Sequence, residues 1–296
     1  MTAAATNLSA ISRLFSSSVF RQLAEKGRSP LFARLLADSG LIDTALAAGT
    51  LGSSFDAAFA ALKKSGKRDE YVYRSALTHN ILLGRHSLKT ASLLTEFRAG
   101  SCRADVAILN GTSTVYEIKS ERDTLGRLEN QLLNYRKVFA KVYVVVAEPF
   151  IEKILQLTDE NIGVMSLERW NRVRTVREAV DQADAVCPLT ILDSLRLAEA
   201  TEILNNLGIE VPALPNTKMR AAMQERFAAL PARSVHAEMV RVLKRARSLA
   251  SLSTLVDRLP NSLKPAALST RLRLSDHERL VNTLRIPTRQ AMEWAN

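Results

Sequence analysis

The segment from Lys141 to Glu148, "KVYVVVAE", constrains the fold more than any other part of the chain, because Tyr143 to Ala147 is an unbroken apolar run. Successive side chains of a strand point to opposite faces, so such a strand is apolar on both of its faces. Other elements must then cover both faces. The segment therefore predicts an α/β fold in which helices cover a sheet on both sides.

Three earlier segments are short, rich in Val, Ile or Leu and bounded by Gly, Asn or Ser, which is typical of strands. They are "SLLTEFRAG", "RADVAILN" and "STVYEIKS". After them, Leu128, Leu132, Tyr135 and Phe139 recur at helical spacing and predict an amphipathic helix. A further helix starts at Pro149, and "NIGVMSLE" reads as a last strand. The predicted order is strand, strand, strand, helix, strand, helix, strand.

Both ends of the chain are predicted to be helical. We expect a helical N-terminal region over 1–67, the α/β core over 68–187, and a helical, basic C-terminal region over 188–296. Pro212 and Pro215 mark the expected linker. The N-terminus is apolar and poor in acids, as transit peptides are. The helical spacing of its apolar residues favours a packed amphipathic helix instead: Leu8, Ile11, Phe15, Val19 and Leu23.

Composition limits the compartment and the partners. No run of about 18 uninterrupted apolar residues occurs, so we expect no membrane span. Cys102 and Cys187 fit no metal-ligand spacing or disulfide framework, which favours a reducing, cytoplasmic compartment. The net charge is +11, and residues 216–296 carry 15 basic against 6 acidic side chains. Such a surface attracts polyanions, nucleic acid being the commonest, although a solubilising role explains the charge equally well.

Three charged residues stand inside the predicted strands: Asp105, Glu117 and Lys119. Glu117 and Lys119 share a strand face, and Asp105 comes beside Glu117 if the two strands form a hairpin. Two converging carboxylates repel unless a divalent cation lies between them. With the lysine they predict a hydrolytic site. The carboxylates would hold Mg²⁺ or Mn²⁺, the metal would lower the pKa of a bound water, and Lys119 would position that water or stabilise charge on a phosphate.

Structural roles for these residues remain open. Asp105 could pair with Arg103 or Arg98 at a strand edge. Glu117 and Lys119 could form an exposed ion pair that contributes under about 1 kcal/mol. The four histidines do not form a site: His79 and His86 could share a helix face, but no third ligand is near in sequence.

Asp105 at the start of one strand and Glu117-Ile118-Lys119 on the next, in this element order, resemble the signature of the PD-(D/E)XK, or restriction-endonuclease-like, phosphodiesterase superfamily. Ala104 stands where the namesake pattern has Pro. The resemblance covers roughly residues 68–170, and neither flank contributes to it. It implies an αβββαβ core, with helical N- and C-terminal flanks around it, and hydrolysis of phosphodiester bonds.

A second motif narrows the resemblance. Gln131 and Tyr135 match the Gln-x-x-x-Tyr helix of the RecB-like branch, and the run is similar to a small, poorly characterised bacterial subgroup. Gln131 could also be a tolerated edge position of the apolar stripe. Members usually add an upstream acid, for which Glu96 fits, while Glu70 is a rival because many members place this acid on the first core helix. The resemblance implies metal binding by Glu96, Asp105, Glu117 and the Ile118 carbonyl, and catalysis by Asp105, Glu117, Lys119 and Gln131.

The metal-site interpretation makes a geometric prediction. Residues directly opposite in an antiparallel pair share a face. A two-residue turn at Asn110-Gly111, the obvious hairpin signal, sets Asp105 opposite Tyr116 and turns Glu117 to the other face. Asp105 lies opposite Glu117 only if the loop spans residues 110–112, or if a tight turn is combined with a β-bulge.

The C-terminal region carries the predicted nucleic-acid contacts. In "SVHAEMVRVLKRARSLA" one helix face is apolar, and Arg241, Lys244 and Arg245 lie on the rest of the surface. Few aromatic residues lie nearby, so we expect contact with phosphates, of DNA in the first place, and no base stacking. Two alternatives stay open. One is a catalytically inactive nuclease fold that acts as a DNA-binding or adaptor module. The other is an interaction protein that dimerises or binds a protein partner through its helical flanks.

Overall fold

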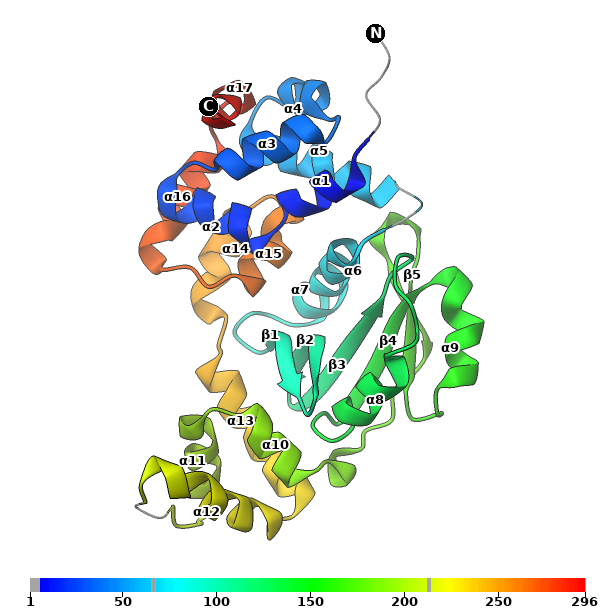
Figure 1. The fold of residues 1–296 in the computed structure, drawn as a ribbon, viewed down its shortest axis with the longest axis vertical. Helices are drawn as coiled ribbons and strands as arrows, with labels where there is room; N and C mark the ends of the chain where they lie inside the picture. The colour runs from blue at the N-terminus through cyan, green and yellow to red at the C-terminus, as the bar shows by residue number, and fades with distance from the viewer. Residues whose placement is uncertain (1–5, 65, 67, 212–213, 296) are drawn as a thin grey trace. The chain divides into compact units, whose positions relative to one another are not determined.

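The computed structural model describes residues 6–64, 66, 68–211 and 214–295, which form two compact units. The first takes in the described residues up to His79, residues 120–122 and those from Ala250 onward. The second takes in Asn80–Lys119 and Asp123–Leu249. Figure 1 shows the elements of each. The helices of the expected C-terminal region 188–296 are thus shared between the units, because the last of them pack with the N-terminal helices.

The first unit is all helical. Its helices are α1 (Leu8–Leu14), α2 (Ser17–Lys26), α3 (Pro30–Asp38), α4 (Ile42–Ala48), α5 (Leu51–Lys64), α6 (Glu70–Leu77), α14 (Ser253–Arg258), α15 (Lys264–Ser269), α16 (Leu274–Leu284) and α17 (Thr288–Met292). The expected N-terminal helix is two helices, because Ser16 caps α2 by accepting a hydrogen bond from the Val19 amide. Its apolar stripe is buried as predicted, with Ile11, Val19 and Leu23 fully covered.

The second unit is built around a six-stranded sheet in the order β1-β2-β3-β4-β5-β6. Figure 1 labels β1 to β5. The strands are β1 (Ser92–Ala99), β2 (Cys102–Asn110), β3 (Thr112–Lys119), β4 (Lys141–Ala147), β5 (Gly163–Leu167) and β6 (Val173–Arg177). The β3–β4 and β4–β5 pairs are parallel, and the other pairs are antiparallel. The mixed α/β architecture and the order of the first five strands are as expected. The sixth strand, "VRTVR", was not predicted, because Arg174 and Arg177 lie three residues apart and place one arginine on each face of the strand.

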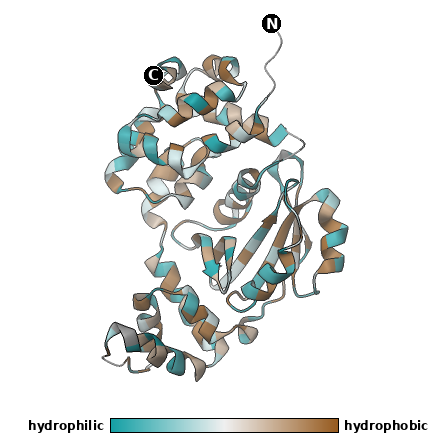
Figure 2. Ribbon diagram, in the orientation of Figure 1, coloured by the Kyte–Doolittle hydropathy of each residue, from teal (hydrophilic) through white to brown (hydrophobic). Residues whose placement is uncertain are grey.

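Helices of this unit alternate hydrophobic and hydrophilic residues (Figure 2), as elements with one buried face do. They are α7 (Leu83–Arg85), α8 (Leu128–Tyr135), α9 (Ile151–Leu157), α10 (Pro188–Ser194), α11 (Leu197–Asn206), α12 (Asn216–Ala228) and α13 (Ala232–Ala246), with a π-helical turn, Thr78–Leu82, before α7. One hydrophobic core joins Val115, Val142 and Val144 of the sheet to side chains of α8, α9, α10, α11 and α13. Of the expected linker, Pro212 lies outside the described residues and Pro215 caps α12.

Both faces of the central strands are buried, as the apolar run in β4 predicted. Ile108, Tyr116 and Val145, which point away from the core just described, are exposed by only 3%, 5% and 0%. No helix in the described part of the chain is long and apolar enough to span a bilayer.

Two contacts hold α8 and α13 in register with the β1–β2–β3 strands. Asn134 of α8 accepts a hydrogen bond from the Ser101 amide at 3.1 Å, and a Cβ at Gly100 in the same turn would collide with the Asn134 side chain. His236 of α13 is buried, and its Nε2 lies 2.7 Å from the Ser113 hydroxyl of β3. The Asn134 contact fixes the helix that carries Gln131 against the strands that carry the predicted acids.

Candidate functional site

The β2–β3 hairpin has the register that the metal-site interpretation requires. Val106 pairs with Tyr116, and at the tip Asn110 pairs with Thr112 across Gly111, whose φ of +73° suits glycine. Continued by one step, this register sets Asp105 opposite Glu117, on the same side of the sheet. The prediction that a regular two-residue turn is absent is therefore confirmed.

The backbone of Asp105 forms no ladder pair with β3, and the Asp105 side chain contacts β3 instead. Its Oδ2 accepts a hydrogen bond from the Ile118 amide at 2.8 Å. The carboxylate is thereby held beside the Glu117–Lys119 segment of β3. The Ile118 amide thus contacts a candidate ligand, and metal binding by the Ile118 carbonyl, which the resemblance implies, stays a prediction.

Glu117 and Lys119 lie inside the protein, with 1% and 5% of their surfaces exposed. Lys119 Nζ donates to Glu117 Oε1 at 2.7 Å and to Gln131 Oε1 at 2.8 Å. The structure thus brings Glu117, Lys119 and Gln131 together, from β3 and α8. The alternative of an exposed ion pair is wrong, because both side chains are buried. Breaking such a buried pair costs about 3–5 kcal/mol.

Tyr135, one helical turn after Gln131, completes this cluster. Its hydroxyl oxygen lies 2.7 Å from Glu117 Oε2 and 2.7 Å from the Arg103 carbonyl oxygen. A single hydroxyl proton cannot serve two acceptors fully. Tyr135 therefore bridges Glu117 and Arg103, and its hydroxyl donates to one of the two acceptors at a time.

Burial raises the pKa of Glu117 above its ordinary value, while the charge of Lys119 and the hydrogen bonds from Lys119, Tyr135 and Gln131 oppose this rise. Burial, together with the neighbouring Glu117, also raises the pKa of Tyr135, which therefore stays protonated. The sequence places Tyr135 in the Gln-x-x-x-Tyr motif and on the apolar stripe of its helix, but nothing in the sequence indicates its hydrogen bond to the Arg103 carbonyl.

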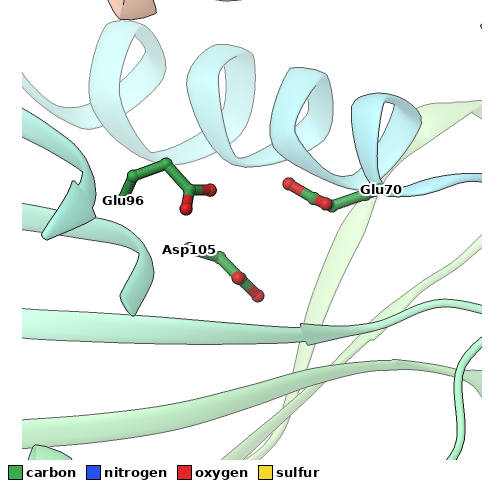
Figure 3. Close-up of side chains that lie close together, drawn as sticks. All are labelled: Glu70, Glu96 and Asp105. Carbon is green, nitrogen blue, oxygen red and sulfur yellow. The ribbon is translucent and has the colours of Figure 1, made fainter. Parts of the chain in front are cut away.

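Glu96 and Asp105 form a second acidic group on the β1–β2 pair. The ladder runs from Thr95–Val106 to Phe97–Ala104 and leaves the pair between them unbonded. Their nearest carboxylate oxygens lie within 4.8 Å of each other, and Figure 3 draws both side chains.

The backbone at Glu96 is strained. Its φ is +52°, in the left-handed region that costs a non-glycine residue roughly 1–2 kcal/mol. The distortion reverses the strand faces: Leu94 and Phe97 both enter the same hydrophobic core, although strict alternation would separate them. Strain of this kind collects at functional sites. No sequence signal predicts it, because glutamate does not favour this conformation.

Glu70, the rival acid that Figure 3 also draws, lies at the start of α6 in the first unit, where it is exposed and forms an ion pair with Arg74. Glu117 does not belong to the acidic group around Asp105, since Lys119 and Tyr135 hold its two oxygens. The predicted site residues of the second unit therefore form two adjoining clusters, and the Asp105–Ile118 hydrogen bond joins them.

The predicted phosphate contacts lie on α13, with their charged groups on the surface. Arg241 pairs with Glu238 at 2.9 Å and Arg245 pairs with Glu202, yet both arginine side chains remain 71% exposed. Among the described residues, Lys244 has no ion-pair partner.

Comparison with known proteins gives a family. The family model described as Bacteriophage P4 protein cII matches residues 63–269, more than half of the chain. Protein cII of Enterobacteria phage P4 is 34% identical over 113 residues, which are 37% of this chain and 42% of that protein. A solved structure, the SPO1766 protein of unknown function from Silicibacter pomeroyi, matches 40% of this chain and 80% of its own with 19% identity and a TM-score of 0.28, too low to support an argument. The matched residues include both clusters and the whole of α13, and the chain belongs to the bacteriophage P4 protein cII family.

Proposed function

We propose that this chain is a metal-dependent nuclease, a Mg²⁺- or Mn²⁺-dependent phosphodiesterase that hydrolyses nucleic acid, DNA in the first place. We also propose that the first five strands with α8 form a PD-(D/E)XK core. The observation that carries the proposal is the buried cluster of Glu117, Lys119 and Gln131 beside Asp105. The free cysteines, Cys102 and Cys187, fit a reducing cytoplasmic compartment.

The carboxylates fit a hard divalent cation. Glu96 and Asp105 bring carboxylate oxygens within 4.8 Å of each other, an arrangement that like charges oppose and a divalent ion stabilises. The strained backbone at Glu96 holds one of these acids in place. Glu117 would join them once its oxygens are released from Lys119 and Tyr135. Glu70 remains the alternative upstream ligand that the resemblance suggests.

Each side chain has a role that follows from its contacts. A bound divalent ion would supply positive charge for the nucleophile and for the phosphate. The Lys119 ammonium orients an attacking water or stabilises negative charge on the phosphate, and Gln131 fixes its position through a 2.8 Å hydrogen bond. Tyr135 holds Glu117 in its rotamer by a contact of 2.7 Å. Because these groups are nearly dry, their electrostatic effect is stronger than in water.

A substrate panel tests the proposal. Purified protein is incubated with plasmid, linear duplex DNA, single-stranded DNA and RNA, with Mn²⁺ or with EDTA, and Asp105→Asn runs alongside. We expect hydrolysis only with Mn²⁺ and only by the protein with an intact Asp105. Equal digestion by Asp105→Asn would overturn the site assignment. Parallel Glu96→Gln and Glu70→Gln variants identify the upstream ligand by which of them loses activity.

One observation favours a second candidate, a DNA-binding or adaptor module without catalysis. The charge of Lys119 is already neutralised by Glu117 and withdrawn from solvent. A fold that uses this pair as structure would bind duplex DNA and leave it intact. Binding without hydrolysis across Mg²⁺ and Mn²⁺ concentrations would select this candidate.

A further inference from the structure

A basic groove of about 520 Å³ lies in the second unit, beside the β2–β3 turn. Its polar and charged lining comes from α13, from the segment before β1 and from the turn itself. These residues are Lys89, Gly111, Arg241, Lys244, Arg245 and Ser248. The groove brings Lys89 to the three basic residues of α13, a juxtaposition that their separation in the sequence conceals.

The charge balance of the groove is strongly positive. No acidic residue is among its lining residues, while four are cationic. Lys89 and Lys244 have no ion-pair partner among the described residues, and the pairs of Arg241 and Arg245 leave 71% of each side chain exposed. At Gly111 no atom lies within 4 Å of the place where a Cβ would stand, so the floor of the groove is open there.

The lining also indicates which polyanion fits. It contains no aromatic side chain, so it offers no platform on which unpaired bases could stack. Flexible ammonium and guanidinium groups around an open floor suit phosphates that point outward, as those of a duplex do. Phosphate contacts of this kind position a duplex without reading its sequence.

We propose that this groove binds the phosphate backbone of duplex DNA and holds the substrate of the nuclease site. The inference deepens the proposed function and rests on it for the identity of the polyanion. Lys89 and Lys244 are its principal contacts, since within the described residues neither side chain forms an ion pair.

Binding of a fluorescein-labelled 24-base-pair duplex, measured by fluorescence anisotropy in EDTA from 50 to 300 mM NaCl, tests the groove without hydrolysis. We expect Lys89→Ala/Lys244→Ala to flatten the slope of log K against log salt by about 1.8, since each phosphate contact contributes about 0.9. At about 0.1 M salt the affinity should fall about tenfold or more. Lys137→Ala/Lys153→Ala is the matched control, because both lysines are exposed in the same unit and line no part of the groove.

An unchanged slope in the groove variant, or an equal loss in the control, would overturn the inference. So would tighter binding of single-stranded DNA than of the duplex by the wild type. Because no metal is present, failure here leaves Mn²⁺-dependent hydrolysis standing. Conversely, a protein that binds through the groove but hydrolyses nothing would remove the proposed activity and keep the groove.

Discussion

Comparing Glu96→Gly with Glu96→Gln separates the effect of the backbone strain at Glu96 from the effect of losing its charge. The left-handed backbone costs a glutamate roughly 1–2 kcal/mol. Glycine relieves this strain, but its greater freedom in the unfolded chain offsets roughly 0.5–1 kcal/mol of the gain in stability. Without metal, Glu96→Gly should therefore be more stable than Glu96→Gln by about 0.5–1 kcal/mol. Both variants lose the same negative charge beside Asp105, so the difference reports on the backbone alone.

Urea unfolding of the two variants and of wild type, in EDTA and then in Mn²⁺, measures both effects. Mn²⁺ at about 100 times its Kd should stabilise the wild type by about 2.7 kcal/mol and should stabilise neither variant to that extent. Asn171→Gly is the comparison, since Asn171 is the other described non-glycine residue at positive φ, at 62°, and asparagine tolerates this region better. A Glu96→Gly variant less stable than Glu96→Gln would refute the strain, and full Mn²⁺ stabilisation of Glu96→Gln would refute its role as a ligand.

Three further outcomes follow from the same contacts. Tyr135→Phe leaves Glu117 and the Arg103 carbonyl without their shared hydroxyl, so it should lower the free energy of unfolding by about 1–3 kcal/mol in urea titrations; an unchanged value would show that the hydroxyl bonds neither. Burial lowers the pKa of His236, so the folded state keeps it neutral; its contribution is complete above the unfolded pKa of about 6.5 and is lost as pH falls toward the folded pKa. Unfolding measured from pH 7.5 to 5 should thus lose stability more steeply in wild type than in His236→Gln, and parallel curves would contradict this. Finally, Asp105 of β2 and Gly111 of the turn that follows β2 lie six residues apart along an extended chain, about 20 Å or roughly six base pairs of duplex. Cleavage of DNA stem-loops should therefore respond to Lys89→Ala/Lys244→Ala for stems of 16 base pairs and not for stems of four, and an equal response at both lengths would refute the span.

Much of the second unit followed from local pattern. The apolar run in β4 fixed both covered faces, and helical spacing located α8. The hairpin register followed from chemistry: the requirement that Asp105 and Glu117 share a side excluded the turn that Asn110-Gly111 alone would suggest. Local signals succeed here because strand alternation and helix periodicity are properties of neighbouring residues.

What the sequence could not predict depends on tertiary packing. The division into units failed to follow the regions expected from composition, because the helices from Ala250 onward pack with the N-terminal ones. The positive φ at Glu96 opposes the preference of its own residue type. The burial of Glu117 and Lys119, and the approach of Lys89 to α13, arise from segments far apart in the chain. Strand alternation places Glu117 and Lys119 on the same face, but the sequence does not show that they are buried or which side chains they contact.

The central claim is that Glu117 and Lys119 belong to a metal-dependent hydrolytic site. Single-turnover hydrolysis of a labelled linear duplex in Mn²⁺ tests it, with wild type compared to the double variant Glu117→Gln/Lys119→Gln. That variant removes both buried charges together, so it avoids leaving one unpaired and should keep the fold. We expect wild type to cut in Mn²⁺ and not in EDTA, and the folded double variant to be slower by at least about 100-fold. A wild type that leaves every duplex intact, or a double variant that cuts at the wild-type rate, would contradict the account.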